Sequence, residues 1–242
     1  MIDLFTPDMQ FSVNEFVTKA DEYCREIYNS NAIPVVIGGT GFYIKNFLTG
    51  LPKTPESNEI IREQLKEEAK KCGLPYMHQK LMTVDPESAS VINPNDEYRI
   101  IRALEVFYST GVPRSNFKLS NELREEYKFY TVILERERSE LYKRIDIRID
   151  KMFEEGLEEE VNKLIKLGYK KEDPGMQAIG YREFFMNLSS VDEIKQKIKH
   201  DSHKYAKKQY VYMKGISNAI NIFVTDDEKY IKEVYEFIKE LF

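Results

Sequence analysis

The fold of this chain is decided by one stretch of sequence, Ile33-Pro34-Val35-Val36-Ile37-Gly38-Gly39-Thr40-Gly41-Phe42-Tyr43-Ile44-Lys45-Asn46-Phe47-Leu48. The β-branched apolar run at 33–37 predicts a buried strand, and the apolar periodicity after Gly41 predicts a helix. A glycine-rich turn between a strand and a helix gathers backbone N–H groups at the positive end of the helix dipole, and Thr40 adds a hydroxyl donor there. The stretch therefore predicts an α/β fold with an anion- or nucleotide-facing loop at the carboxyl edge of a parallel sheet.

A second interpretation of the loop stays open at this point. The glycines of a tight strand-to-helix turn can serve packing alone. The loop matches neither the Walker A pattern G-x-x-x-x-G-K-[ST] nor the dinucleotide fingerprint G-x-G-x-x-G, so no known phosphate-binding motif decides between the two.

The composition is that of an ordinary soluble protein. Of the 242 residues, 32% are charged and 42% are hydrophobic. No apolar run is long enough for a membrane span, and no signal peptide is visible. Cys24 and Cys72 have no disulfide or zinc spacing, and the histidines add no metal-ligand pattern. We therefore expect a cytoplasmic protein with no membrane contact and no metal ligands among these residues.

The net charge of −5 argues weakly against nucleic acid, but the distribution of charge points the other way. Seven lysines against one acid lie between Lys195 and Lys214. The same segment carries Tyr205, Tyr210 and Tyr212, on which bases could stack. An amphipathic helix whose lysine side chains cover apolar surface is the alternative.

The pattern along the chain predicts an α/β core with an all-helical insertion. Residues 1–53 and 129–242 form the expected core, and residues 54–128 form the insertion. Short strands are predicted at 130–134 and 221–224. Helices are predicted at 12–29, 58–71, 76–84, from Pro86, between Asp96 and Gly111, and at 139–155, 157–167, 191–214 and 228–242. Ser12 and Glu15 form a predicted capping box, and Asp85 and Asp96 are predicted to cap the helices that follow them.

Several arginines are spaced to share one helix face. Arg99 and Arg102 are three residues apart, and Arg144 and Arg148 are four apart. Guanidinium groups suit phosphate. For Arg99 and Arg102, and equally for Arg62, a solvated face paired with glutamates is the simpler alternative.

Eight collinear motifs together resemble those of bacterial tRNA dimethylallyltransferases, also called tRNA isopentenyltransferases. The resemblance covers about residues 1–215. The motifs are Met1-Ile2-Asp3, Phe11-Ser12-Val13-Asn14-Glu15-Phe16, Gly38-Gly39-Thr40-Gly41-Phe42-Tyr43, Asp85-Pro86, Asn95-Asp96-Glu97-Tyr98-Arg99-Ile100-Ile101-Arg102-Ala103-Leu104-Glu105-Val106, Leu141-Tyr142-Lys143-Arg144-Ile145, Met176-Gln177-Ala178-Ile179-Gly180-Tyr181 and Tyr205-Ala206-Lys207-Lys208-Gln209.

The resemblance implies a P-loop NTPase-like core with a tRNA-binding helical insertion. The implied reaction moves a dimethylallyl group from dimethylallyl diphosphate to N6 of the adenine next to the tRNA anticodon, with Mg²⁺ as cofactor and a monomer as the working form. Thr40 resembles a catalytic threonine that contacts the substrate nucleotide. The implied diphosphate or phosphate contacts are Arg144, Arg148 and Lys207. The implied tRNA contacts are Arg62, Tyr98, Arg99, Arg102, Gln177, Gly180, Tyr181 and Arg182.

Two family motifs have no counterpart in the 242 residues. These are the P-loop G-P-T-x-x-G-K-[ST] and the D-S-x-Q-x-Y motif, whose aspartate resembles the general base. We therefore expect an N-terminally truncated member that is inactive alone, with the Mg²⁺ ligands in the missing segment. A catalytically dead RNA-binding remnant or regulatory domain is the competing hypothesis. A nucleotide kinase relative would not account for the motifs at 95–106 and 176–181.

Overall fold

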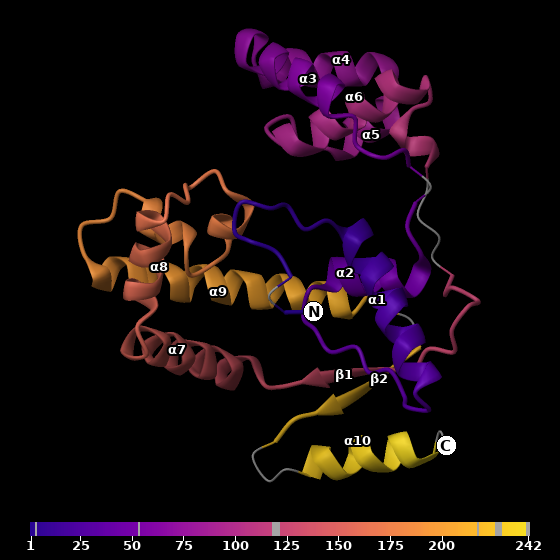
Figure 1. Ribbon diagram of the computed structural model, residues 1–242, viewed down its shortest axis with the longest axis vertical. Coiled ribbons are helices and arrows are strands. Elements are labelled where there is room, and N and C mark those ends of the chain that lie inside the picture. Colours follow the sequence, from indigo (N-terminus) through magenta and orange to yellow (C-terminus); the bar gives the residue numbers. More distant parts are fainter. Residues whose placement is uncertain (3, 53, 118–121, 217, 226–228, 241–242) are drawn as a thin grey trace. The chain divides into compact units, whose positions relative to one another are not determined.

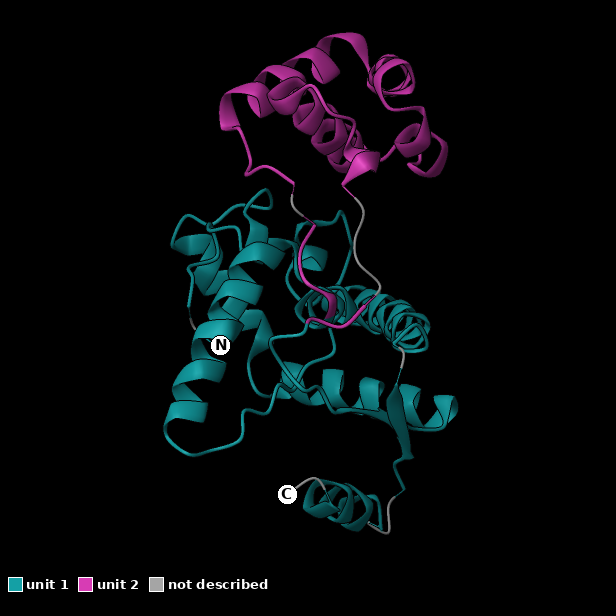
Figure 2. Ribbon diagram, turned by 90° about the vertical axis from the view of Figure 1, so that its right-hand side faces the viewer, with its two compact units in different colours: residues 1–48, 125–242 teal, residues 49–124 magenta. Residues whose placement is uncertain are grey.

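The computed structural model describes residues 1–2, 4–52, 54–117, 122–216, 218–225 and 229–240. The chain divides into two compact units (Figure 2). Residues 1–48 and 125–242 form what we call the larger unit, and residues 49–124 form the helical unit. The two functional domains predicted above stay a prediction, with residues 1–53 and 129–242 in one and residues 54–128 in the other. Their boundary at Lys53 lies outside the described residues.

Two N-terminal helices of the larger unit pack through aromatic side chains. Helix α1 (Val13–Asn29) begins at the predicted capping box, in which Ser12 and Glu15 bond each other's backbone N–H groups. Helix α2 (Gly41–Thr49) follows the glycine-rich loop. Phe16 of α1 stacks on Tyr43 of α2 with ring centroids 5.0 Å apart. The prediction of these two helices is confirmed.

The predicted buried strand at 33–37 is wrong. These residues form no strand, and the side chains of Val35 and Ile37 are 69% and 91% exposed. An apolar run becomes a strand only when a neighbouring backbone pairs with it, and no strand that the structure describes pairs with this one. The run therefore leads into the loop as exposed, irregular backbone.

The sheet of the larger unit is small and parallel (Figure 1). Strand β1 (Thr131–Glu135) pairs with β2 (Ala219–Phe223), in register from Thr131 opposite Ala219 to Glu135 opposite Phe223. Helix α10 (Lys229–Glu240) packs against β2. Both strands were predicted with slightly different ends, so the α/β class with a parallel sheet is confirmed. Residues 228, 241 and 242 of the predicted last helix lie outside the described residues.

A second hydrophobic core of the larger unit lies between its long helices. Its fully buried members include Val161, Met176 and Ile198. Gly156, with φ of +99°, makes the turn that separates two of the helices. The elements around this core are α7 (Arg138–Glu154), α8 (Leu157–Lys166), the 3₁₀ turns η2 (Pro174–Gln177) and η3 (Arg182–Phe185), and α9 (Val191–Met213).

The helical unit has its own core and contains only helices among its described elements. They are α3 (Glu59–Cys72), α4 (Leu74–Val84), α5 (Pro86–Val91), α6 (Glu97–Thr110) and the 3₁₀ turn η1 (Arg114–Asn116). Met77, Leu81 and Leu104 are fully buried between them. Each such side chain contributes about 1.5–3 kcal/mol by leaving water. The predicted caps at Asp85 and Asp96 are confirmed. None of the helices that could be searched is long and apolar enough to cross a membrane.

Candidate nucleic-acid interface

The glycine-rich loop is held against α9. The carbonyl oxygen of Gly39 accepts a hydrogen bond of 2.8 Å from Gln209 Nε2, and Thr40 Oγ1 lies 3.4 Å from Tyr205 Oη. The carbonyl oxygen of Thr40 accepts from the backbone N–H groups of Tyr43 and Ile44 in the first turn of α2. Thr40 is exposed. The structure therefore places the predicted Thr40 at the surface, next to an exposed tyrosine of α9.

Glycine is required at the start of α2 by close packing. A Cβ atom on Gly41 would lie 2.7–2.8 Å from three carbon atoms of Tyr212. No side chain fits at that distance without moving the loop or α9. Gly41 therefore serves packing, whereas Thr40 is exposed and could contact a ligand. The anion-binding role of the loop stays a prediction.

The lysines of α9 fall into two groups. Lys195 and Lys199 pair with Asp150 of α7, and Lys197 bonds Asp201. Lys195 and Lys199 thus link α9 to α7, whereas the Lys197–Asp201 pair lies within α9. The others include Lys204, Lys207 and Lys208, which are exposed and form no ion pair with any residue that the structure describes. Tyr205, Tyr210 and Tyr212 are exposed on the same helix. Charge and aromatic surface therefore occur together, as single-stranded nucleic acid requires.

The predicted arginines of α7 differ in their surroundings. Arg144 pairs with Glu140 at 3.0 Å, and Arg148 is exposed. The same helix is linked to α9 by Tyr142, whose ring stacks on that of His203 at 4.2 Å. Arg144, Arg148 and Lys207 thus all belong to the larger unit, and their shared phosphate-binding role stays a prediction.

Residues 177–183 form a compact turn around a buried carboxylate. Glu183 is fully buried, and it accepts 2.8 Å from Gly180 N and 2.9 Å from Arg182 Nε. Gly180 has φ of +104°, which only glycine adopts readily. Arg182 Nη2 also donates to Asp201 of α9 at 2.8 Å. The predicted Gly180 and Arg182 are therefore brought together on Glu183.

The Asp201 carboxylate is strongly stabilised by this network. Burial would raise the pKa of Asp201, but hydrogen bonds and positive charge from Lys197 and Arg182 lower it to about 2. Lys197 Nζ lies 2.6 Å from Oδ1. Asp201 is consequently ionised at neutral pH.

The other two predicted residues of this turn lie nearer the surface. Tyr181 donates its hydroxyl to the Glu160 carboxylate of α8. Burial and that hydrogen bond raise the pKa of Tyr181 to about 12, so the phenol stays protonated. Gln177 is exposed, and its amide nitrogen donates to the carbonyl oxygen of Lys171.

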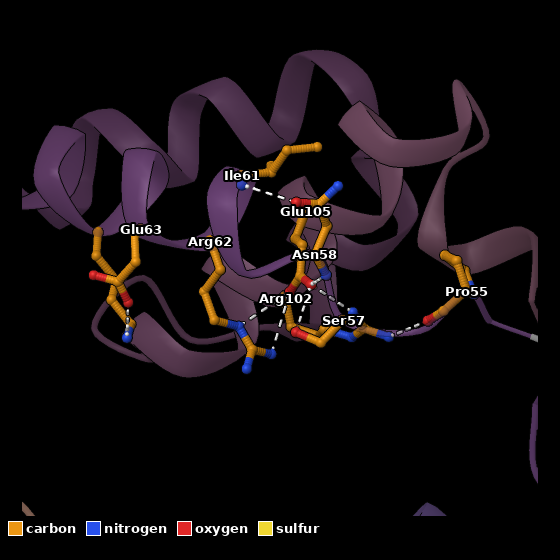
Figure 3. Close-up of polar contacts among 9 residues, drawn as sticks. Pro55, Ser57, Asn58, Ile61, Arg62, Glu63, Arg102 and Glu105 are labelled. Atoms are coloured by element: carbon orange, nitrogen blue, oxygen red, sulfur yellow. Dashed lines mark hydrogen bonds and ion pairs between the residues drawn. The ribbon is translucent and has the colours of Figure 1, made fainter.

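The helical unit presents two arginines on one buried carboxylate (Figure 3). Arg62 of α3 and Arg102 of α6 lie 3.2 Å and 2.9 Å from opposite oxygens of Glu105, which is fully buried. Burial would raise the pKa of Glu105, but hydrogen bonds from Ser57 and Asn58 lower it. The two guanidinium groups lower it further, so the net shift is below the ordinary value.

Arg99 and Tyr98 are the exposed members of the same predicted set. Arg99 is 69% exposed and pairs with Asp96 at the start of α6. Tyr98 is 72% exposed. Of the alternative considered for the arginines, Arg99 shows the solvation but pairs with an aspartate. Arg62 and Arg102 show the pairing with a glutamate, at partly buried positions.

Sequence reasoning places Glu105 only on a solvated face, as a partner for the arginines, and it misses the roles of Glu183 and Asp201. Glu105 follows Arg102 by three residues inside the apolar run of α6, and an acid in such a run signals a buried ion pair. Glu183 and Asp201 carried no such local signal, because their partners depend on how η3 meets α9. Gln209, which holds Gly39 from 170 positions away, carried none either.

The described residues contain no group of three or more histidine, cysteine, aspartate or glutamate side chains that could hold a metal ion. They therefore supply no evident Mg²⁺ site, and Mg²⁺ binding stays a prediction.

Comparisons with known proteins give a consistent result. A model of the IPP transferase family matches residues 1–215. A tRNA dimethylallyltransferase from Thermoanaerobacter sp. is 39% identical over 241 residues, covering 97% of this chain and 76% of the relative. One from Geobacter sulfurreducens is 36% identical, covering 88% of this chain and 70% of the relative.

Two solved structures are similar as well. The tRNA isopentenylpyrophosphate transferase of Bacillus halodurans matches with a TM-score of 0.66 and 32% identity, over 99% of this chain and 76% of that one. A eukaryotic dimethylallyltransferase acting on tRNA matches with a TM-score of 0.77 and 23% identity, over 96% and 61%. At that identity the second match supports the fold alone.

Proposed function

Because the chain belongs to the IPP transferase family, we propose that it serves tRNA modification by dimethylallyl transfer. The proposed reaction joins the dimethylallyl group of dimethylallyl diphosphate to N6 of the adenine next to the anticodon, at tRNA position 37. A C–N bond forms, the C–O bond to diphosphate breaks, and N6 gives up a proton. The observation that carries the proposal is the family match over residues 1–215, which include every candidate site residue named above.

The described surfaces support contact with an RNA stem-loop. Arg62, Arg99 and Arg102 supply guanidinium groups for phosphate, and Tyr98 supplies an exposed ring. In the larger unit, α9 offers unpaired lysines beside exposed tyrosines. We propose that these groups bind the anticodon stem-loop of tRNA, and that the protein acts as a monomer.

The groups proposed for the reacting atoms lie in the larger unit. The exposed hydroxyl of Thr40 would position the target adenine after it leaves the base stack. Arg144, Arg148 and Lys207 would neutralise diphosphate charge. Mg²⁺, if bound, would neutralise that charge further, but the described residues give no site for it and no step is assigned to it. The residue that accepts the N6 proton is not assigned.

Binding of tRNA by the 242-residue chain tests this proposal. We expect a dissociation constant that rises about 10- to 1000-fold between about 50 and 200 mM salt, because each neutralised phosphate releases counterions. Filter binding with a labelled anticodon stem-loop measures it. A triple Lys→Gln variant at Lys204, Lys207 and Lys208 should weaken binding and flatten the salt dependence.

A matched triple variant controls for net charge. Lys163, Lys166 and Lys170 are exposed lysines of the same unit outside the proposed interface. Their replacement by glutamine should change affinity little. An equal loss in both triple variants, or an affinity that salt does not alter, would show that the lysines of α9 form only a solvated face.

A non-catalytic RNA-binding role is the second candidate function. The observation that favours it is the exposed lysine and tyrosine surface of α9, which suits RNA whether or not a group is transferred. Incubation with tRNA, Mg²⁺ and labelled dimethylallyl diphosphate separates the two. Binding without transfer supports the second function for these residues, and turnover establishes the first.

A further inference from the structure

Glu105 lies at the centre of the polar cluster that joins α6 to the beginning of α3 (Figure 3). We infer that Glu105 is a positioning residue for RNA binding, which fixes Arg62 and Arg102 side by side so that both can meet RNA phosphate. The inference rests on the proposed function, because it takes tRNA as the ligand of the two arginines.

Both carboxylate oxygens of Glu105 are engaged by hydrogen bonds and ion pairs within the cluster. Oε1 accepts 2.9 Å from Ser57 Oγ and 2.7 Å from Asn58 N, and it lies 2.9 Å from Arg102 Nη1. Oε2 lies 3.2 Å from both Nε and Nη2 of Arg62. The side chain of Glu105 is fully buried. Glu105 is therefore not available to a ligand, and it can act only through the groups that it holds.

The arginines keep donors that the cluster does not use. Arg62 engages Glu105 through Nε and Nη2, and its Nη1 has no partner among the residues described. Arg102 also donates from Nη2 to the carbonyl oxygen of Pro55 at 2.7 Å. The two side chains are still 27% and 20% exposed. The two guanidinium groups and the single carboxylate leave a net charge of +1 on the cluster, at the surface of the helical unit.

Held arginines bind with a smaller loss of side-chain entropy than free ones. An arginine whose rotamer is already fixed loses little further freedom when phosphate arrives. Arg99, at 69% exposed, provides the contrast within the same helix. The cluster thus provides two ordered guanidinium groups between the beginning of α3 and α6.

Replacement of Glu105 by glutamine distinguishes positioning from simple charge, because the two make opposite predictions. Removing a buried negative charge raises the net positive charge, so electrostatics alone would tighten RNA binding. Loss of positioning would weaken it. We expect Glu105→Gln to weaken binding of the tRNA stem-loop about 5- to 20-fold, because two side chains must then be ordered on binding. Binding of an unstructured RNA of equal length should stay unchanged or tighten slightly.

A double-mutant cycle shows whether Glu105 acts through the arginines. In a chain that already carries Arg62→Gln and Arg102→Gln, the further change Glu105→Gln should cause no further loss of affinity. An equal loss in that background, or tighter tRNA binding by Glu105→Gln alone, would overturn the inference. Glu67→Gln, at an exposed position of α3, is the control for the change in charge.

Folding is checked separately by circular dichroism, with affinities measured well below the melting temperature. If Glu105→Gln does not fold, Ser57→Ala removes one hydrogen bond to Glu105 without changing charge. It should weaken tRNA binding about 2- to 3-fold by loosening the cluster, and unchanged binding by a folded Ser57→Ala chain would overturn the inference in that case. Failure of the wild-type chain to bind tRNA would overturn the proposed function itself, whereas normal wild-type binding with an unaffected Glu105→Gln variant overturns only the positioning role.

Discussion

Replacing Arg182 with methionine is expected to destabilise the larger unit by about 2–4 kcal/mol at neutral pH. The change leaves Glu183, which is fully buried, and Asp201, which is nearly so, without the guanidinium that joins them. Removing one partner of a buried charge network leaves the remaining charges uncompensated. The free-energy cost of that is usually larger than the net stabilisation that the intact pair provides. Because the Arg182 side chain is 36% exposed, we place the expected loss below that of a fully buried pair.

Acid should reduce this difference between wild type and variant. The pKa of Asp201 is about 2 in the folded chain and 3.8 as the reference value. A folded pKa below the unfolded one stabilises the fold above pH 3.8, and that stabilisation is lost as pH falls toward 2. The wild type therefore loses stability over this window. The Arg182→Met chain loses less there, because its Asp201 has lost one of the groups that lower the pKa.

Urea unfolding at neutral pH and near pH 3 measures both effects. Lys151→Met is the matched control, because Lys151 forms an exposed i,i+4 pair with Glu155 in the same unit. That change should alter stability by less than about 0.5–1 kcal/mol. If Arg182→Met is no more destabilising than the control, the network does not hold η3 against α9, and Arg182 would be free for RNA.

Sequence reasoning succeeded where the signals are local. The capping box of Ser12 and Glu15, the caps at Asp85 and Asp96, and the helix end at Gly111 all lie within four residues of the groups they bond. These signals fix most of the helical unit. They also explain why its all-helical character could be predicted.

Sequence reasoning failed at 33–37 because strand pairing is not local. The run Ile33-Pro34-Val35-Val36-Ile37 has the composition of a buried strand, but composition does not supply a partner backbone. In the described residues the only pairing is between β1 and β2, which are far apart in sequence. The run is consequently exposed, and the glycine-rich loop takes its position from α9 instead of from a sheet.

The candidate site shows the same division. The arginines and the threonine could be chosen as residue types suited to phosphate and base, and they lie on the predicted elements. The groups that orient these side chains could not be predicted, because the partners are distant in sequence. Ser57 and Glu105 are 48 residues apart, and Thr40 and Tyr205 are 165 apart. The position of a side chain in a site depends on such contacts, which helical periodicity does not encode.

Replacing Gly41 with alanine is expected to separate the glycine-rich loop from α9. Gly41 has no positive φ, so its backbone conformation permits alanine. Alanine is also about 1 kcal/mol more favourable than glycine within a helix. The new Cβ would nevertheless lie 2.7–2.8 Å from Cβ, Cγ and Cδ1 of Tyr212. A rotamer change can move Cγ and Cδ1, but the backbone fixes Cβ, so the contact at 2.8 Å with Cβ remains and the loop or the helix must move.

Overpacking of this kind destabilises by about 1–3 kcal/mol, which lowers the melting temperature by several degrees in a unit of this size. Gly38→Ala is the matched control, because the nearest atom to its Cβ is Ile44 Cδ1 at 3.9 Å, an ordinary contact. Thermal melts of the two variants measure the difference. The Tyr212→Ala change removes the ring but keeps Cβ, so it should relieve part of the Gly41→Ala effect, with a coupling of at least about 0.5 kcal/mol in the double-mutant cycle. Equal melting temperatures for Gly41→Ala and Gly38→Ala, or strict additivity with Tyr212→Ala, would mean that α9 does not set the position of the loop that carries Thr40.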